Sequence, residues 1–556
     1  MNKKVCSFPI LFALLALLIG TCAVVFPASA QAAPTSTGSI TVSGTVASSY
    51  DAYQIFSANV VDGDSDAKIA TDLAWASGAV RGAALPVLHS AGMSNSQTTA
   101  QEAAGWLNID SHLTSALSAQ LARSLQSSGA VSVALNAGTT AELPCGYWLI
   151  VADDDAISQG EAGTAPIMAL VGGSAVSVKP KAATPKVSKH VLEDSAAAWQ
   201  KVADATVADD LYWRLSATVP AGLTAYDTYT VRFVDTMSAG LDPSKVAASM
   251  RVYVAAGADG GFDAVQTDKD GSVGTEPAKG WTDITAQCAT KVAADGKTFT
   301  VRTGDLITAL GGADAFTAGA RVVAVYDAPL NSACNHGIAK GNPNEVYLRY
   351  PRSPFADQSG DAGFTRTPSD DACAYTWDLA LTKRGSDGDK PLAGAVLSIT
   401  DDRGRTLAAD GTWDAEGKAT VTTGEDGRVT VSGVDSGKLE VRELKAPKGY
   451  TAFEGTRSVT VKAEGLDVDQ VAAAKPKLTI TAESPLRADS ADGSTGSLEA
   501  SLINTPTGTP PSITTGGFMP STGDMAMYAA AAAAVAGAAL IVVALLVKRG
   551  GGSHKE

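Results

Sequence analysis

Short alternating strands set the strongest limit on how this chain can fold. Over residues 186–355 and 374–506, apolar and polar residues alternate in short runs, and Gly/Asp-rich turns such as 423–427 separate the runs. A period of two is typical of a strand with one buried face, and turns at short intervals connect such strands into antiparallel sheets. Two stretches of this kind predict two β-sandwiches.

The N-terminal stretch has a different pattern. Apolar runs at 147–151 and 167–171 indicate short strands, whereas the segment over about 95–128 is rich in Ala, Ser, Gln and Leu. Its apolar residues recur at helical spacing: Ala103, Leu107, Leu113, Leu117 and Leu121. The predicted fold class is therefore mainly β, with tandem immunoglobulin-like β-sandwiches preceded by a mixed α/β N-terminal domain.

Proline and glycine mark the expected boundaries, because proline removes a strand hydrogen-bond donor and stiffens the chain. We expect an N-terminal domain over 31–182, a middle domain over 183–355 and a linker over 356–373. A third domain is expected over 374–506, followed by a Pro/Thr/Gly spacer over 507–518 that has no potential to form a core.

Both ends of the chain carry a long apolar run. At the start, two lysines precede an apolar run over 8–26 and a small-residue site, which predicts a signal peptide over 1–30 cut after Ala30. Cleavage near Ala32 or Ala33 is the alternative. Near the other end, residues 525–547 carry no charge and precede two basic residues, which predicts a membrane span with a cytoplasmic tail.

A pentapeptide stands directly before this second apolar run: Met519, Pro520, Ser521, Thr522 and Gly523. Together with the span and the basic tail, over 519–556, it resembles the cell-wall sorting signal of Gram-positive surface proteins, usually Leu-Pro-x-Thr-Gly. The resemblance implies that a sortase cuts between Thr522 and Gly523 and transfers the threonine to an amine. Met519 replaces the usual leucine, which leaves the sortase class open.

Three polar residues of the third domain fall where strand alternation places apolar ones. Lys383 follows Leu379 and Leu381 on one face of a strand, and Glu443 and Asn504 hold the equivalent place on two other strands. A single buried lysine is costly, so three inward polar groups indicate one shared site.

Burial explains what such a site can do. It lowers the pKa of a lysine and raises the pKa of a carboxylic acid, so that both become neutral. Neutral Lys383 would attack the side-chain amide of Asn504, while Glu443 acts as the acid and shuttles protons. Loss of ammonia leaves a Lys–Asn isopeptide bond, and the fold supplies the proximity that an enzyme would otherwise provide.

The third domain resembles the Cna protein B-type domain of Gram-positive pilins and adhesins. The resemblance rests on Lys383, on the Leu-Ala-Gly-Ala segment at 392–395, and on Glu-Leu-Lys-Ala-Pro-Lys-Gly-Tyr at 443–450, which matches the E-box of that family. Asn504 lies in the strand where the family places its asparagine.

The middle domain repeats the pattern. Lys189, Asp235 and Asn344 each share a strand face with apolar residues, which predicts a second bond with Asp235 as the acid. Lys186 and Asn342 are the neighbouring alternatives. The segments at 234–241 and 344–350 look like those of the Cna A-type domain in fimbrial shaft proteins.

One lysine between the first two domains is a candidate for linkage between subunits. The segment Val-Lys-Pro-Lys at 178–181 is similar to the pilin motif Val-Tyr-Pro-Lys-Asn of sortase-assembled pili. The similarity implies that Lys181 supplies the amine that receives Thr522 of another subunit. Lys179 is the rival candidate.

Composition narrows the remaining function classes. A net charge of -15 argues against nucleic-acid binding, and only 5 histidines, with no Cys/His cluster, argue against a metal site or cofactor. Export would permit disulfides, and Cys288–Cys334 is the expected pair within one domain, whereas Cys145 and Cys373 are left open.

The resemblances taken together imply a major (shaft) pilin of a Gram-positive bacterium, a structural protein and not an enzyme. Its expected partners are a sortase, further pilin subunits and peptidoglycan, and its expected location is the cell surface, anchored to the wall. The alternative is a monomeric wall-anchored adhesin that binds a host surface ligand through residues 31–180 and uses the sandwiches as a stalk.

Overall fold

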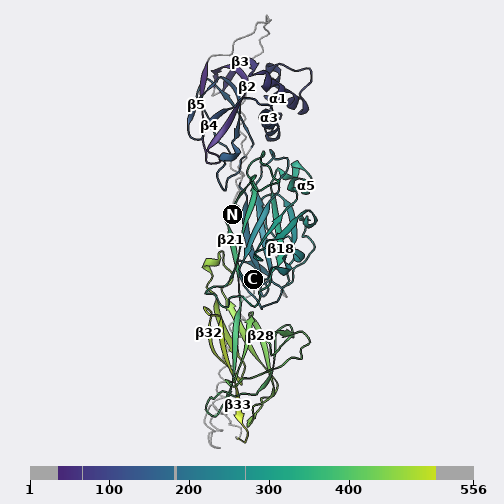
Figure 1. The fold of residues 1–556 in the computed structure, drawn as a ribbon, viewed down its shortest axis with the longest axis vertical. Coiled ribbons are helices and arrows are strands. Elements are labelled where there is room, and N and C mark those ends of the chain that lie inside the picture. The colour runs from purple at the N-terminus through teal and green to yellow at the C-terminus, as the bar shows by residue number, and fades with distance from the viewer. Residues whose placement is uncertain are drawn as a thin grey trace, which may run out of the picture.

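The computed structural model describes residues 36–64, 67–109, 111–163, 165–180, 184–268 and 271–508. They form three domains arranged end to end along the long axis of the molecule, with the three longest helices, α1, α2 and α3, gathered in the N-terminal domain at one end (Figure 1). The other two domains are almost entirely β-sheet. This arrangement confirms the predicted class of tandem sandwiches preceded by a mixed α/β domain.

The N-terminal domain has three layers. A three-stranded sheet, β5-β1-β8, packs on a five-stranded sheet, β3-β2-β6-β7 with β4 beside β2, and helices cover the other face of the larger sheet. Its elements are β1 (Thr37–Val42), β2 (Ser49–Asp62), β3 (Lys68–Trp75), α1 (Gly78–Ser90), α2 (Ala100–Leu107), α3 (Ser115–Ser127), β4 (Val133–Asn136), β5 (Thr140–Pro144), β6 (Gly146–Ala152), η2 (Asp154–Ala156), β7 (Ile167–Val171) and β8 (Val176–Val178).

Local capping explains why the expected helical stretch is divided. Thr99 caps α2, and its side chain and that of Glu102 satisfy each other's backbone N–H groups. Thr114 then accepts a hydrogen bond from the N–H of Leu117 and begins α3. The stretch predicted over 95–128 is therefore two helices, and α1 precedes it outside the predicted range.

The middle domain is a sandwich of two sheets. Their orders are β10-β9-β12-β18-β14-β15 and β11-β21-β19-β13-β17-β16, with β20 beside β19. Its elements are β9 (Lys186–Glu193), β10 (Ala198–Gln200), β11 (Val202–Asp204), β12 (Tyr212–Val219), β13 (Arg232–Met237), η3 (Pro243–Lys245), α4 (Val246–Ser249), β14 (Arg251–Ala256), β15 (Thr282–Asp283), η4 (Thr285–Gln287), β16 (Ala289–Val292), β17 (Thr298–Arg302), α5 (Leu306–Ala309), α6 (Ala313–Phe316), β18 (Ala320–Asp327), β19 (Asn342–Pro351), β20 (Phe364–Arg366) and β21 (Asp370–Tyr375).

The linker expected over 356–373 is wrong where residues 364–366 and 370–373 form strands. Its residues form β20 and most of β21, and both strands pair with β19 in the middle domain. The alternation of apolar and polar residues does not reveal these two strands in the sequence, because β20 has three residues and only the end of β21 is apolar.

The C-terminal domain is a second sandwich. Its sheets are β27-β22-β33-β29 with β32 beside β33, and β25-β24-β23-β28-β30-β31 with β26 beside β23. Its elements are β22 (Trp377–Gly385), β23 (Val396–Thr400), β24 (Thr406–Leu407), β25 (Trp413–Asp414), β26 (Val421–Thr422), β27 (Arg428–Val434), β28 (Gly437–Lys445), β29 (Tyr450–Thr451), β30 (Thr456–Glu464), η5 (Val471–Ala473), β31 (Lys477–Ala482), β32 (Leu486–Asp492) and β33 (Ser497–Pro506).

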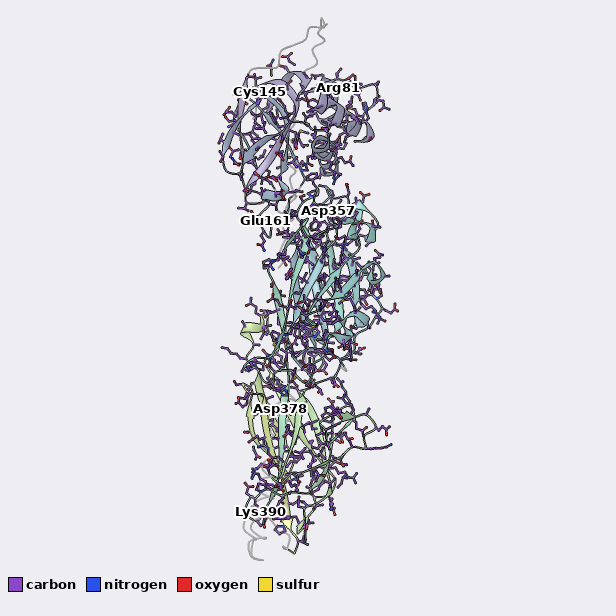
Figure 2. The ribbon with its side chains drawn as sticks, viewed as in Figure 1. Arg81, Cys145, Glu161, Asp357, Asp378 and Lys390 are labelled. Atoms are coloured by element: carbon purple, nitrogen blue, oxygen red, sulfur yellow. The ribbon has the colours of Figure 1, made fainter. Side chains whose placement is uncertain are left out.

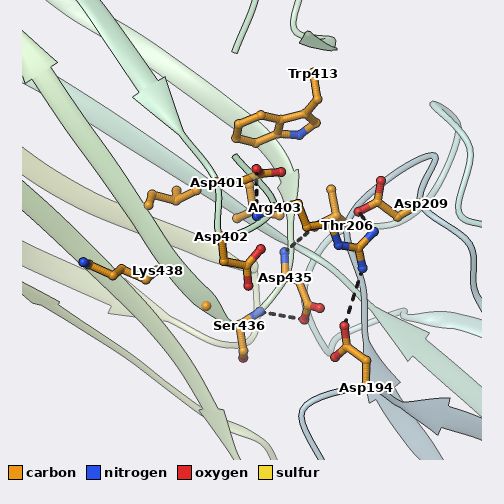
Figure 3. Close-up of a pocket in the computed structure, with 13 residues that line it drawn as sticks. Asp194, Thr206, Asp209, Asp401, Asp402, Arg403, Trp413, Asp435, Ser436 and Lys438 are labelled. Atoms are coloured by element: carbon orange, nitrogen blue, oxygen red, sulfur yellow. Dashed lines mark hydrogen bonds and ion pairs between the residues drawn. The ribbon is translucent and has the colours of Figure 1, made fainter. Parts of the chain in front are cut away.

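Charged side chains join the middle and C-terminal domains around a small pocket (Figure 3). Arg405 donates to both carboxylate oxygens of Asp209, at 2.5 and 2.8 Å, and Arg403 lies 2.8 Å from Asp209 and 3.7 Å from Asp194. The indole N–H of Trp377 donates to Asp204 at 2.6 Å. These contacts fix the two sandwiches against each other instead of leaving them on a free linker.

Candidate functional site

The C-terminal domain brings Lys383, Glu443 and Asn504 together in its core. Alternation along β22, β28 and β33 turns each of them inward, and their exposed fractions are 0%, 6% and 2%. β22 and β33 run parallel, with Gly385 opposite Asn504, so Lys383 lies two residues from that position on the same face. Glu443 reaches them from the facing sheet.

The distances place the acid between the amine and the amide. Lys383 Nζ lies 3.4 Å from Glu443 Oε1 and 3.4 Å from the carbonyl oxygen of Leu502. Asn504 Nδ2 donates to both carboxylate oxygens of Glu443, at 2.9 and 3.0 Å. Glu443 also accepts from the backbone N–H of Phe453 at 3.1 Å, which holds its orientation.

Burial prepares the amine for attack. It lowers the pKa of Lys383 to about 8, although Glu443 favours the charged form and opposes the shift. A lysine with this pKa is partly neutral at physiological pH, and the neutral amine is the nucleophilic form.

The amide has one unused acceptor. Asn504 Oδ1 is buried and has no hydrogen-bond partner among the described residues. Rotating the amide so that Oδ1 and Nδ2 exchange places would let this oxygen accept a proton from Glu443. The arrangement thus provides a nucleophile, an amide carbon and an acid that can polarise the amide.

The middle domain assembles a second set from Lys189, Asp235 and Asn344, all fully buried. They come from β9, β13 and β19, and β9 belongs to the sheet that faces the other two strands. Lys189 Nζ donates a hydrogen bond to Asp235 Oδ2 and lies 5.5 Å from the centre of the Trp213 ring.

A fourth residue, Tyr326, connects this set. Its hydroxyl on β18 accepts from Lys189 Nζ at 2.8 Å and from Asn344 Nδ2 at 2.8 Å, and it donates to Asp235 Oδ2 at 3.0 Å. Tyr326 is not among the residues that the sequence predicts for this set. Strand alternation does not single it out, because Val323 and Val325, which lie between the residues of its face, are apolar and buried as well.

Burial also sets the charges of the middle set. It lowers the pKa of Lys189 to about 8, against the pull of Asp235. It raises the pKa of Asp235, with Lys189 opposing, and raises that of the Tyr326 hydroxyl well above its usual value. Asn344 Oδ1 and Asp235 Oδ1 are buried without hydrogen-bond partners among the described residues.

The structure separates the alternatives in this domain. Lys186 is exposed at the start of β9, away from the buried set. Asn342 is buried, but its side chain bonds to the backbone of Asn335 and Ala374 instead of to a lysine or an acid. Asn342 is the first residue of β19, and the strand continues through Pro343.

The disulfide predicted between Cys288 and Cys334 is wrong. The cysteines of the described part of the chain are free thiols: Cys145, Cys288, Cys334 and Cys373. Cys288 directly precedes β16, whose first residue pairs with Arg302 beside the start of β13. Cys334 packs against Gly240, beyond the end of β13. The two cysteines therefore lie near opposite ends of the sandwich, beyond the roughly 7 Å between Cα atoms that a disulfide allows.

Several predicted features lie outside the described residues: the signal peptide over 1–30, Lys181, the pentapeptide over 519–523 and the apolar run over 525–547. Lys179, the rival of Lys181, is exposed just after β8. No helix within 36–508, as far as that range is described, is long and apolar enough to cross a membrane. In the same residues, no group of three or more His, Cys, Asp or Glu side chains is arranged to hold a metal ion.

Comparison with known proteins gives a match in the C-terminal domain. Residues 378–475 match the family described as SpaA, prealbumin-like fold domain. The Trypsin-resistant surface T6 protein of Streptococcus pyogenes serotype M6 is 30% identical over 143 residues, which cover 24% of each chain. The chain thus spans about a quarter of the length of that relative.

Two solved structures align along most of the chain. The T6 backbone pilin of serotype M6 S. pyogenes has 17% identity and a TM-score of 0.46, covering 85% of this chain and 98% of that one. The full-length major pilin SpaD from Corynebacterium diphtheriae has 15% identity and a TM-score of 0.41, with the same coverage, 85% and 98%. The family match and the T6 relative confirm the resemblance to Gram-positive pilins that the motifs indicate.

Proposed function

We propose that this chain is the shaft subunit of a covalently assembled pilus on the surface of a Gram-positive bacterium. The observation that carries the proposal is the pair of buried Lys–acid–Asn sets, each between the first strand of a sandwich and one of its last. The sorting pentapeptide after the second sandwich and the family match support the same function.

Each set is proposed to form one isopeptide bond. Neutral Lys Nζ attacks the amide carbon of asparagine, while Asp235 or Glu443 donates a proton to the amide oxygen. The tetrahedral intermediate then collapses, the C–N bond of the amide breaks, and the nitrogen leaves as ammonia with a proton relayed from the attacking amine. The products are Lys189–Asn344 and Lys383–Asn504 bonds, and no cofactor is required.

These bonds suit a protein that carries tension. A bond between the first and a late strand of a sandwich prevents pulling force from separating those strands, which raises kinetic stability. It also restricts the unfolded chain, as a disulfide that closes a long loop does.

Assembly is proposed to proceed through the two ends of the subunit. A sortase would cut after Thr522 and hold it as a thioester, and Lys181 of another subunit would displace the enzyme to form an intersubunit amide. The last subunit of the shaft would be transferred to peptidoglycan, which anchors the fibre in the wall.

A monomeric wall-anchored adhesin is the competing hypothesis. The observation that favours it is the N-terminal domain, whose α/β layers differ from the two sandwiches and could bind a host ligand. In that case the same isopeptide bonds would stiffen a stalk, and Lys181 would have no role in linkage.

Wall extracts of cells that express the chain with its sortase distinguish the two hypotheses. The pilus proposal predicts a ladder of multimers that resists boiling in SDS and disappears in Lys181→Ala, whereas the neighbouring control Lys179→Ala leaves it intact. The absence of a ladder in the wild type would favour the adhesin. A ladder that is lost only in Lys179→Ala would show that the linkage lysine is misassigned.

A further inference from the structure

A hollow lies where the N-terminal and middle domains meet. Its volume is about 490 Å³, and its walls are Ile157 and Gln159 on one side and residues of β19 and β20 on the other. Across this junction the Tyr350 hydroxyl donates to the carbonyl oxygen of Gly160 at 2.8 Å. Figure 2 marks the junction by the labels of Glu161 and Asp357.

Four arginines form a row across the sheet that borders the hollow. Strand register places them directly opposite one another on β17, β13, β19 and β20: Arg302, Arg232, Arg349 and Arg366. Arg352, just beyond β19, also lines the hollow. Like charges opposite each other destabilise a sheet, so packing alone gives no reason for this row.

One carboxylate neutralises part of the positive charge of the row. Asp361 lies 2.5 Å from Arg232 and 3.0 Å from Arg349, and among the described residues it is the only carboxylate within 4 Å of any of these guanidinium groups. Burial, and after it the neighbouring arginines, lower the pKa of Arg232, while Asp361 opposes the shift. The row therefore keeps an excess of positive charge in a chain whose net charge is -15.

Arg232 and Arg349 use their Nη donors on the segment 358–361, whereas the guanidinium of Arg366 makes no hydrogen bond within the described residues. Arg366 is exposed and lies over the ring of Tyr347, 5.0 Å from its centre, and Arg232 lies 3.9 Å from the centre of the Phe364 ring. Arg352 donates to the carbonyl oxygen of Asp154 through Nη1 at 3.2 Å, while its buried Nε has no partner in the described chain. Stacking on a ring orients a guanidinium without using its N–H groups.

The lining indicates the chemistry of a ligand. Guanidinium groups bind sulfate, phosphate and carboxylate through paired hydrogen bonds. The amide of Gln159 and the hydroxyl of Thr365 also line the hollow and suit hydroxyl groups. Little apolar surface is available for peptide side chains, because Ile157 is half-buried and Phe364 is 4% exposed. The volume is that of a site for a ligand of several rings, larger than a single inorganic ion needs.

We propose that the arginine row and the hollow bind an anionic carbohydrate, a short chain of sugar or polyol units that carries sulfate or phosphate groups. This site is separate from both Lys–acid–Asn sets and does not depend on pilus assembly. Sulfated glycans and polyol phosphates of the bacterial wall share this chemistry, and binding measurements with one probe of each kind distinguish the two sources.

The test is titration calorimetry of the purified protein with two probes, a sulfated heparin hexasaccharide and an oligomer of glycerol phosphate. We expect one of them to bind, and Arg366→Gln to weaken that binding about tenfold or more, the loss of one hydrogen bond to a charged group. Arg366 is exposed and joins no ion pair in the described residues, so the variant should fold normally. Arg81→Gln, an exposed arginine on α1, is the matched control.

Four outcomes would overturn the proposal. These are no binding of either probe, unchanged binding in Arg366→Gln, an equal loss in Arg81→Gln, and self-association that Arg366→Gln abolishes while neither probe binds. The last outcome would assign the row to an acidic face of a second copy. Selective loss in Arg366→Gln supports the proposal, and the probe that binds identifies the source.

Discussion

The two buried sets contain the same residue types in different strand arrangements. In the C-terminal domain, Lys383 and Asn504 occupy neighbouring parallel strands of one sheet, and Glu443 comes from the facing sheet. In the middle domain the acid and the asparagine occupy neighbouring strands, and Lys189 comes from the facing sheet. Only the middle set includes a tyrosine hydroxyl.

This difference shows which features the proposed chemistry needs. It requires an amine, an acid and an amide that meet in a buried space, and it does not require one strand order. The mechanical result differs, however. The C-terminal bond would join adjacent strands within a sheet, whereas the middle bond would join the two sheets of a sandwich across its core.

The largest expected effect comes from replacing each acid by its amide. Glu443→Gln and Asp235→Asn keep the lysine and asparagine but remove the proton donor, so each should leave one bond unformed. Intact mass of the wild type should fall about 34 Da below the sequence mass, one ammonia per bond, and each variant should recover about 17 Da. The free energy of unfolding of the affected domain should be about 5 kcal/mol lower, which is the chain-entropy value for closing so long a loop.

The matched control is Glu440→Gln, which changes an acid on the same strand that faces away from the core. It should keep the full mass deficit. A wild type without any mass deficit would contradict both proposed bonds. If the full deficit survives in Asp235→Asn but not in Glu443→Gln, Asp235 is not the acid of the middle domain.

An intermediate effect is expected from Tyr326→Phe, which tests the feature that distinguishes the two sets. Loss of the hydroxyl removes the contact that holds the amine beside the amide, so bond formation in the middle domain should slow by about tenfold. Bond formation in the C-terminal domain should not change. Mass spectrometry of proteolytic fragments during refolding measures both rates in one sample.

Tyr253→Phe is the control for this variant, because Tyr253 is equally buried in the same domain but donates to the backbone of Thr275. Equal slowing in both variants would mean that the effect of Tyr326→Phe comes from packing. An unchanged rate in Tyr326→Phe would remove Tyr326 from the proposed mechanism.

The smallest effect is a pH dependence of unlinked domains. Asn344→Ala and Asn504→Ala keep a buried free amine whose pKa is about 8 when folded and 10.5 when unfolded. Between these values the unfolded state binds more protons, so stability should rise with pH from about 8 to 10. Deprotonation of Asp235, whose pKa burial raises from 3.8, acts in the opposite sense, because it lowers stability as the pH rises above that value.

Thermal unfolding of both variants over this pH range measures the effect. The linked wild type contains an amide in place of each amine and should lack the rise. A rise of stability of equal size in the wild type would mean that the lysines remain unbonded. That result would agree with an absent mass deficit and would contradict the proposed bonds.

Strand alternation carried most of what could be predicted about the two sets. A period of two assigns Lys383, Glu443 and Asn504 to inward faces whatever the pairing of their strands, and the structure buries all three. The same reasoning places Lys189, Asp235 and Asn344 inside. The sandwich class follows from the same local pattern, because one-sided burial of a strand depends on residues close together in the chain.

The tertiary structure alone decided how distant segments meet. It shows that Tyr326 completes the middle set, that Asn342 bonds to backbone, that Cys288 and Cys334 lie near opposite ends of a sandwich, and that residues near 370 extend a sheet. The arginine row likewise exists only through the register of four strands that are spread over residues 232–366. Local alternation determines which way a side chain points, but register and sheet order determine what it touches, and these depend on long-range packing.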